Sequence, residues 1–271
     1  MSDSETQDDR DSYELLVIGG GVAGLTAATF TARAGLTTLV VDHGESILRR
    51  NAHLENFPGF PAGVNPRLFA DMLQAQATRN GAGYQQGLVE ELSGSLDEGF
   101  VATVGAVGNA DDRREISADR VLVASWADVG YLEGIGVDIR DAGSKQYVED
   151  DGLSRTNIKG IYAAGRIAER YHQAVIAAGD GAAAAITLIH DSETPFYNDW
   201  VVPEGYFTDR GREVPPGCEE IDAAEQQARQ AASRAAMQEY FSEAHEERQR
   251  THPSLVDDEK GRVDWDEEAA Q

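Results

Sequence analysis

Cysteine is almost missing from this sequence, since Cys218 is the only one among 271 residues. A single thiol cannot form an intrachain disulfide, and it excludes both a C-x-x-C redox pair and a cysteine-rich zinc site. The six histidines never show H-x-x-x-H or H-E-x-x-H spacing, so we expect no metal site. Disulfide exchange within the chain is therefore excluded as its chemistry.

Basic residues are also scarce. The chain has 23 Lys and Arg against 48 Asp and Glu, which gives a formal net charge of -25. Such a surface repels nucleic acid and anionic membranes, so neither is expected as a partner. The acidic residues are spread along the chain and lysine is nearly replaced by arginine, a pattern that favours a halophilic source. An ordinary acidic cytosolic protein is the alternative.

Long apolar runs are lacking too. Residues 1–12 are polar and acidic, without the basic and apolar regions of a signal peptide, and are predicted to be a disordered leader. No run approaches the length of a membrane span. These patterns predict a cytoplasmic protein.

Residues 13–190 show the pattern of one α/β domain. An apolar run at 13–18 ends in three glycines, helical spacing follows over 22–34, and a second apolar run covers 37–41. Together they predict a βαβ unit with buried parallel strands. Further on, the patterns predict a structured loop at 51–66, a helix at 66–80, an antiparallel excursion at 88–92, 100–104 and 116–123, a strand at 159–163 and a helix at 171–190. The expected fold is a Rossmann-type, doubly wound domain with a small antiparallel β excursion.

Residues 191–271 are expected to form an acidic, helical C-terminal extension. We predict a loop over 194–216 and a long charged helix over 219–250 with one weakly apolar, alanine-rich face. This face is expected to dock onto the domain, and a partner-binding or dimerisation helix, giving a homodimer, is the alternative. Cys218 would lie near the helix start, where a dipole can activate a thiol, but neither a base nor a second thiol is visible. An inert surface thiol is the preferred interpretation.

The glycine turn is the motif that carries the chemistry. Gly19, Gly21 and Gly24 satisfy G-x-G-x-x-G between the first strand and helix, and Asp42 ends the second strand. Gly19 permits the tight turn, Gly21 lets a pyrophosphate approach, and Gly24 lets the helix pack on the strand. With Val22 and Ala23 at the helix start, the free N–H groups suit an anion. Asp42 would accept hydrogen bonds from the ribose hydroxyls; a glycine turn without a ligand is the alternative.

Three later segments resemble the FAD half of thioredoxin reductases, which are FAD-dependent pyridine nucleotide-disulfide oxidoreductases. They read ENFPGFP at 55–61, GIYAAG at 160–165 and QAV followed by GDGAAA within 173–184, and the likeness covers about residues 13–189 with a gap. The resemblance implies FAD as cofactor, with the proline–glycine loop beside the flavin and the last helix start at its pyrimidine end. The further cofactor-binding residues that it implies are Asn51, Asn56, Gly165, Arg166, Gln173, Ala174 and Val175.

Two features of that family have no counterpart here. Its NADPH domain should follow the strand that ends near Ala124, but only residues 125–136 precede the resumed FAD half. The family's C-x-x-C lies in that missing part, and Cys218 cannot replace it. The sequence therefore predicts that disulfide reduction by the family mechanism is impossible.

Two expected cofactor contacts are also changed. Ser125 and Trp126 stand where the family has Thr-Gly, and Arg166 stands where it has an Asp that binds the ribitol. Arg166 could instead pair with the pyrophosphate, and Trp126 could cover the flavin or fill the space of the missing domain. The alternative is a degenerate site that no longer binds flavin.

His53 and His172 are the candidate catalytic residues, because either could donate a proton to a reduced flavin or a substrate. An ordinary loop histidine is the alternative for both. We expect a flavin-dependent oxidoreductase whose electron donor or acceptor is an unknown substrate or protein partner. A non-catalytic flavin-binding module, such as a sensor, scaffold or subunit, is the second hypothesis. An NAD-dependent short-chain dehydrogenase ranks last because no Tyr-x-x-x-Lys pair occurs.

Overall fold

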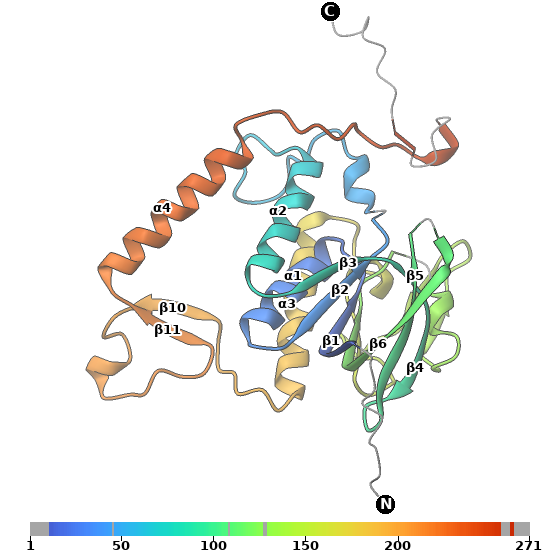
Figure 1. The fold of residues 1–271 in the computed structure, drawn as a ribbon, viewed down its shortest axis with the longest axis horizontal. Coiled ribbons are helices and arrows are strands. Elements are labelled where there is room, and N and C mark those ends of the chain that lie inside the picture. The colour runs from blue at the N-terminus through green and yellow to red at the C-terminus, as the bar shows by residue number, and fades with distance from the viewer. Residues whose placement is uncertain (1–10, 45, 108, 127–128, 256–260, 263–271) are drawn as a thin grey trace, which may run out of the picture.

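A seven-stranded sheet forms the centre of the computed structural model, which describes residues 11–44, 46–107, 109–126, 129–255 and 261–262 (Figure 1). The strand order is β3-β2-β1-β6-β5-β4, and β9 pairs with β6. The strands are β1 (Asp11–Ile18), β2 (Thr38–Asp42), β3 (Gly83–Gln86), β4 (Leu88–Ser95), β5 (Gly99–Ala106), β6 (Asn109–Val123) and β9 (Ile161–Ala163). Pairing is parallel from β3 through β1 and β6 to β9, and antiparallel within β4-β5-β6. The Rossmann-type fold with its antiparallel excursion is confirmed.

Successive side chains of β1 point to opposite faces of the sheet, and each face packs in its own layer of the core. Leu15 and Val17 pack with residues of the helices, which are α1 (Val22–Arg33), α2 (Pro66–Arg79) and α3 (Ala174–Asp191). Leu16 and Ile18 pack on the opposite side, in a core shared with β4, β5 and the 3₁₀ turn η2 (Gly130–Leu132). One face of the parallel sheet is thus covered by helices and the other by the β excursion and the segment that follows it.

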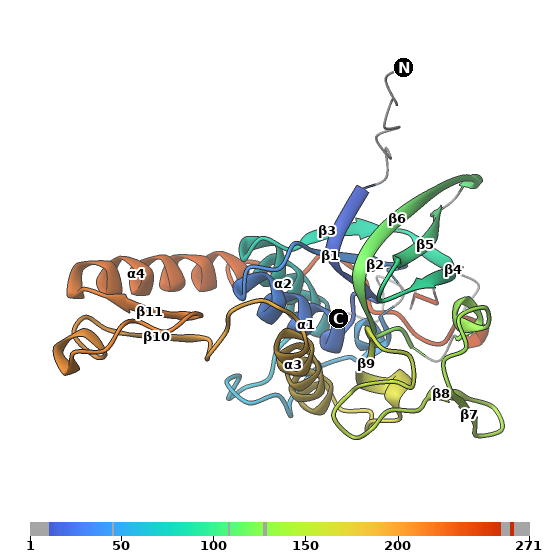
Figure 2. The ribbon, with the colours of Figure 1, turned by 90° about the horizontal axis from the view of Figure 1, so that it is seen from below.

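The helix α3 lies beside α1 in both views (Figures 1 and 2). A Cβ at Gly181 would lie 2.2 Å from the Ala23 carbonyl oxygen, so glycine is required for this close crossing. Among the described residues α3 is the one helix long and apolar enough to cross a membrane. Its buried residues Ala184, Ala185, Leu188 and Ile189 pack in the helical core layer.

Several predicted boundaries differ from the structure. The leader was expected to end at residue 12, but β1 begins at Asp11, which pairs with Ile116 of β6; residues 1–10 lie outside the described residues. The last core helix was expected from residue 171, but α3 begins at Ala174. His172 therefore precedes the helix, because Gln173 keeps extended backbone angles as its N-cap.

The extension contains two strands that the sequence did not predict. The segment expected as a loop holds β10 (Trp200–Pro203) and the turn η4 (Thr208–Arg210), and β10 pairs in parallel with β11 (Cys218–Ile221). The helix α4 (Ala223–Tyr240) begins only after β11 and is shorter than the expected 219–250. Its start is fixed by Asp222, whose side chain accepts a hydrogen bond from the Glu225 N–H.

Residues 198–241, here called the arm, stand away from the body of residues 11–191 (Figures 1 and 2). None of the residues of α4 is buried, so the expectation that its alanine-rich face docks onto the domain is wrong. The arm is anchored at its base by a bidentate pair between Arg33 and Asp199 at 2.6 and 2.7 Å. At its other end Phe241 meets Phe60 with ring centroids 6.4 Å apart.

The chain returns to the body after the arm. The His245 Nε2 lies 2.8 Å from the Asp71 Oδ2, and the Glu247 carboxylate pairs with the Arg49 guanidinium. Arg250 is 8 % exposed and donates to the Gly44 carbonyl oxygen at 2.8 Å. Residues 245–250, together with Asp199 and Phe241, therefore contact the domain, whereas no residue of α4 is buried.

Candidate functional site

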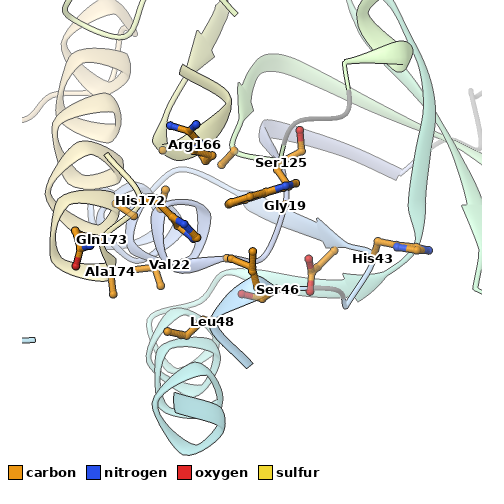
Figure 3. A pocket seen from close by; sticks show the side chains of 18 of the residues that line it. Gly19, Val22, His43, Ser46, Leu48, Ser125, Arg166, His172, Gln173 and Ala174 are labelled. Atoms are coloured by element: carbon orange, nitrogen blue, oxygen red, sulfur yellow. The ribbon is translucent and has the colours of Figure 1, made fainter. Parts of the chain in front are cut away.

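A cavity of about 940 Å³ opens where β1, β2 and β6 end and α1 and α3 begin (Figure 3). Ligands of open α/β sheets bind at this carboxyl edge of the strands, and the volume is near the upper end of small-molecule sites. The predicted site residues that line it are Gly19, Gly21, Val22, Ala23, Asp42, Asn51, His53, Asn56, Gly165, Arg166, His172, Gln173 and Ala174. Gly24 and Val175 are not part of the lining.

The glycine turn has the geometry that each glycine was expected to supply. Gly19 has φ +111°, and a Cβ there would lie 2.7 Å from the Ala124 carbonyl oxygen. A Cβ at Gly24 would lie 1.9 Å from the Gly19 carbonyl oxygen, so this glycine lets the helix touch the strand. A Cβ at Gly21 would meet nothing within 4 Å, and no side chain caps α1 there. The start of α1 therefore offers its N–H groups to open space in the cavity.

Asp42 is held in place by two donors. Its carboxylate accepts hydrogen bonds from the Gly20 N–H at 2.9 Å and from the Tyr84 hydroxyl at 2.7 Å. Burial and the nearby charge of Asp42 raise the pKa of Tyr84 well above its ordinary value, so the phenol stays a donor. Each carboxylate oxygen keeps a free lone pair, which leaves Asp42 able to accept ribose hydroxyls as predicted.

The proline–glycine loop is tied to the start of α3. The Asn56 side-chain amide donates to the Gln173 side-chain oxygen at 2.7 Å, and both residues line the cavity. Gly165, with φ +77°, donates its N–H to Asp180 of α3 at 2.6 Å. Because α1 and α3 cross closely, the starts of both helices face the same cavity. Val175, one residue into α3, is exposed and lies outside the lining.

Arg166 and Trp126 border one end of the cavity. The Arg166 guanidinium lies over the Tyr147 ring, 4.9 Å from its centroid, and donates to the Tyr147 hydroxyl and to the Arg170 carbonyl oxygen. Its Nε is buried without a hydrogen-bond partner in the described part of the chain. Trp126 is 41 % exposed, and its ring centroid lies 4.9 Å from that of His172.

Both candidate catalytic histidines line the cavity. A ring nitrogen of His53 lies 3.1 Å from the Ala62 carbonyl oxygen, so this ring is bound to its own loop. Burial lowers the pKa of His172, and the charges of Arg166 and Lys145 lower it further. His172 is therefore neutral near pH 7, and it is the better placed of the two to take up or release a proton.

The sequence patterns missed part of the lining. The segment after β2 contributes the turn η1 (Ile47–Arg50), and the lining residues not predicted include His43, Ser46, Ile47, Leu48, Leu88 and Tyr131. Their place after strands of the parallel sheet was the available signal, because such loops surround the site in this fold.

Cys218 lies in β11 on the arm rather than at a helix start, and it is not part of the cavity lining. Its Sγ lies 3.5 Å from the Asn198 carbonyl oxygen, which corrects the predicted position at the N-terminus of a helix. No group of three or more His, Cys, Asp or Glu side chains suited to a metal ion occurs among the residues that the structure describes.

Known proteins with similar sequences include FAD-binding domains and thioredoxin reductases. Residues 14–52 match the family described as FAD binding domain. The chain is 34 % identical over 117 residues to thioredoxin reductase of Aquifex aeolicus, which is 42 % of this chain and 34 % of that protein. It is 37 % identical over 82 residues to thioredoxin reductase of Bacillus subtilis, which is 30 % of this chain and 26 % of that protein. The matches thus span about a third or less of these relatives.

Solved structures share the fold. An oxidoreductase from Agrobacterium tumefaciens aligns with a TM-score of 0.57 at 16 % identity over 66 % of this chain and 98 % of that chain. An atypical thioredoxin reductase from Desulfovibrio vulgaris Hildenborough aligns with a TM-score of 0.54 at 20 % identity over 69 % of this chain and 100 % of that chain. The chain thus has a Rossmann-type fold, is similar over part of its length to thioredoxin reductases, and matches the FAD binding domain family over residues 14–52.

Proposed function

We propose that the chain is an FAD-dependent oxidoreductase that exchanges electrons with a small molecule or protein partner reaching the flavin directly. The observation that carries the proposal is the open space beside Gly21, at the start of α1 and inside a cavity of about 940 Å³. A pyrophosphate needs such a cradle, because any side chain at this position would occupy its place.

The residues present fit FAD. The glycine turn and the start of α1 would hold the pyrophosphate, Asp42 the adenosine ribose, and the start of α3 with Gln173 the pyrimidine end of the flavin. When bound, FAD supplies two-electron and one-electron redox chemistry. The hydrogen bond between Asn56 and Gln173 ties the proline–glycine loop to the start of α3. It would therefore hold these two segments in a fixed relative position around the flavin.

The chain's own residues support electron transfer to or from the flavin by a reaction other than disulfide reduction. Cys218 lies on the arm, outside the cavity lining, and no second thiol exists to form a disulfide with it. Residues 124–160 lead from β6 to β9 through η2 and the short hairpin of β7 (Ile139–Asp141) and β8 (Gln146–Val148). This short passage supports the proposal that the family's NADPH domain is missing between these strands.

His172 is the residue that we propose to handle protons. It lines the cavity, its ring contacts Trp126, and its lowered pKa keeps it neutral near pH 7. A neutral imidazole can accept a proton from a reduced substrate or deliver one through its other nitrogen.

The first test is cofactor identity. Protein purified at high salt should show a flavin absorption spectrum, and the acid-released cofactor should co-migrate with FAD. Gly21→Val should lose at least 100-fold in FAD affinity because its side chain fills the pyrophosphate cradle. Gly134→Val is the matched control, since a Cβ there also meets nothing within 4 Å but the residue is outside the cavity lining. Release of NAD alone, or of no nucleotide, contradicts the proposal.

The second test concerns the electron donor. Because the proposal leaves no NADPH domain between β6 and β9 to position the two rings, NADPH or NADH alone should bleach the flavin slowly in anaerobic stopped-flow experiments, while photoreduction should proceed. Fast, saturable bleaching by NADPH would require a nicotinamide site in this chain. It would contradict the proposal that a different small molecule or a protein partner exchanges electrons with the flavin. A flavin that photoreduces but is not reoxidised by any acceptor would favour a non-catalytic binding module.

A further inference from the structure

Arg166 lies at the wall of the cavity and has no ion-pair partner in the part of the chain that the structure describes. The neighbouring arginines Arg140, Arg155 and Arg170 each pair with a carboxylate, but Arg166 pairs with none among the described residues. Its Nε is also buried without a hydrogen-bond partner there. The chain has 48 acidic and 23 basic residues, so carboxylates to pair with arginine are plentiful. A half-buried guanidinium that pairs with none of them would be stabilised by binding an anion.

Lys145 adds a second positive charge to this region, beside the neutral ring of His172. The Lys145 Nζ lies 5.7 Å from the centroid of the Trp126 ring, whose other close neighbour is His172. Lys145 has no carboxylate partner among the described residues, and it is one of only three lysines in the chain. Arg166 and Lys145, with Trp126 and the neutral His172 beside them, are here called the cationic end of the cavity; Lys145 borders the cavity without being part of its lining.

Tyr147 holds the guanidinium in one orientation. This tyrosine is 5 % exposed, its ring lies against the guanidinium and its hydroxyl accepts one N–H. A stacked, hydrogen-bonded guanidinium is pre-organised to bind a planar oxyanion through its remaining donors.

The cationic end is set apart from the loop that follows Asp42. Figure 3 shows Arg166 and Ser125 on one side of Gly19, whereas Ser46 and Leu48 lie on the other side. Arg166 thus lies away from the loop at the expected adenosine side. Trp126, at 41 % exposed, and Tyr171, at 81 % exposed, leave flat aromatic surface open beside it.

We propose that Arg166 and Lys145 bind the carboxylate or phosphate of a small, flat, anionic substrate whose body lies against Trp126. This inference rests on the proposed function, because it places the substrate next to the start of α3, where the flavin ring is expected. A salt link to Arg166 would orient the substrate, and stacking on the indole would hold its plane.

Calorimetric titration with benzoate and with phenyl phosphate tests the proposal, with benzamide as the neutral analogue of benzoate. The titrations are made with and without bound FAD at constant chloride concentration, so the readout does not require a flavin. At least one of the two anions should bind at least tenfold more tightly than benzamide. The tighter of the two shows which kind of oxyanion the site prefers.

Two variants locate the binding. Arg166→Gln should weaken anion binding about tenfold or more, the effect of losing one charge-assisted hydrogen bond. Lys145→Gln should weaken it about threefold. The Lys145 side chain is partly exposed and makes no hydrogen bond with any other described residue, and the backbone bond from the Ala142 N–H to its carbonyl oxygen is kept in the variant. Arg113→Gln makes the same change of charge at an exposed arginine that pairs with Glu90, and it should bind the anion like the unaltered chain.

The outcomes separate this inference from the proposed function. No anion binding, equal binding of benzamide, or unchanged binding in both Arg166→Gln and Lys145→Gln overturns the inference. A tenfold loss of FAD affinity in Arg166→Gln also overturns it, since the guanidinium would then serve the cofactor's pyrophosphate. Failure of the unaltered chain to bind FAD while benzoate binds at Arg166 contradicts the proposed function and leaves the anion site supported.

Discussion

The body and the arm are built on different physical principles. In the body, β1 and β2 place residues such as Leu15, Leu16 and Val40 at zero exposure, and burial of apolar side chains dominates their free energy. In the arm, α4 has no buried residue and depends on helix propensity, its Asp222 cap and ion pairs such as Arg229 with Glu219. The cavity therefore rests on the part that packing defines.

This difference separates global from local stability. Exposed ion pairs contribute about 0–1 kcal/mol each, whereas a change in the buried layers propagates through the close-packed core. Substitutions in the body should therefore shift cooperative unfolding, and substitutions in the arm should mainly change local opening.

The largest expected effect lies where α3 crosses α1. Gly181→Ala should lower the free energy of unfolding by about 2–3 kcal/mol, because its Cβ would lie 2.2 Å from the Ala23 carbonyl oxygen. Gly179→Ala on the same helix meets nothing within 4 Å and should raise stability by about 0.5–1 kcal/mol. Urea unfolding followed by circular dichroism measures both. Similar values for the two variants would mean that the helices do not cross this closely.

Salt should act in opposite directions on the two regions. Screening of a net charge of -25 should raise the melting temperature of the body by on the order of 5 °C between low and molar KCl. The same screening weakens the pair of Arg33 with Asp199 that anchors the arm, so amide exchange in α4 should become faster. Calorimetry and hydrogen exchange measure the two effects. A melting temperature that does not change with salt contradicts the halophilic interpretation.

Two helix caps give a matched pair. Asn65 caps α2 in the body by accepting from the Arg67 and Leu68 N–H groups, and Asp222 caps α4 in the arm. Asn65→Ala should lower global stability by about 1 kcal/mol, whereas Asp222→Ala should leave the main transition in place and speed exchange within α4. Equal shifts of the main transition would show that arm and body unfold as one unit.

The smallest effect is a pH response of the arm. Partial burial opposes the charge of Glu220, but N–H groups of Phe207, Thr208 and Gly205 and the Thr208 hydroxyl donate to it and lower its pKa to about 2. Since the ordinary value is 4.5, this contribution is complete above pH 4.5 and is lost as pH falls toward 2. Carbon-detected NMR of the carboxylate should follow that titration. Glu220→Gln should loosen residues 204–208 at neutral pH without moving the melting temperature of the body.

The sequence predicted the body far better than the arm. The turn from Gly19 to Gly24 carries a local signature, and the strands beside it are continuous apolar runs, so both could be inferred without tertiary information. The strand β10 is four residues long, ends in Pro203, and exists because it pairs with Cys218–Ile221 farther along the chain. The sequence of a four-residue strand does not by itself indicate which distant segment it will pair with.

The end of α4 was missed for a related reason. Helical composition continues to Arg250, but Arg250 binds the Gly44 carbonyl oxygen and His245 contacts Asp71, so tertiary contacts override local propensity. At its start, Asp222 with Glu225 three residues later is a cap signal that the sequence did offer. In the site, Ser46 and Leu48 carry no motif and are placed only by the loop after β2.

The pairing of β1 with β6 and of β6 with β9 has a consequence for synthesis on the ribosome. Leu15 pairs with Arg120, and Val121 then pairs with Ile161, so the central strands meet only after long stretches of chain have emerged. The cavity also needs Gln173 and Ala174. We therefore expect a nascent chain that has not reached α3 to retain its nucleotide poorly, so that cofactor capture follows translation of residues 174–191.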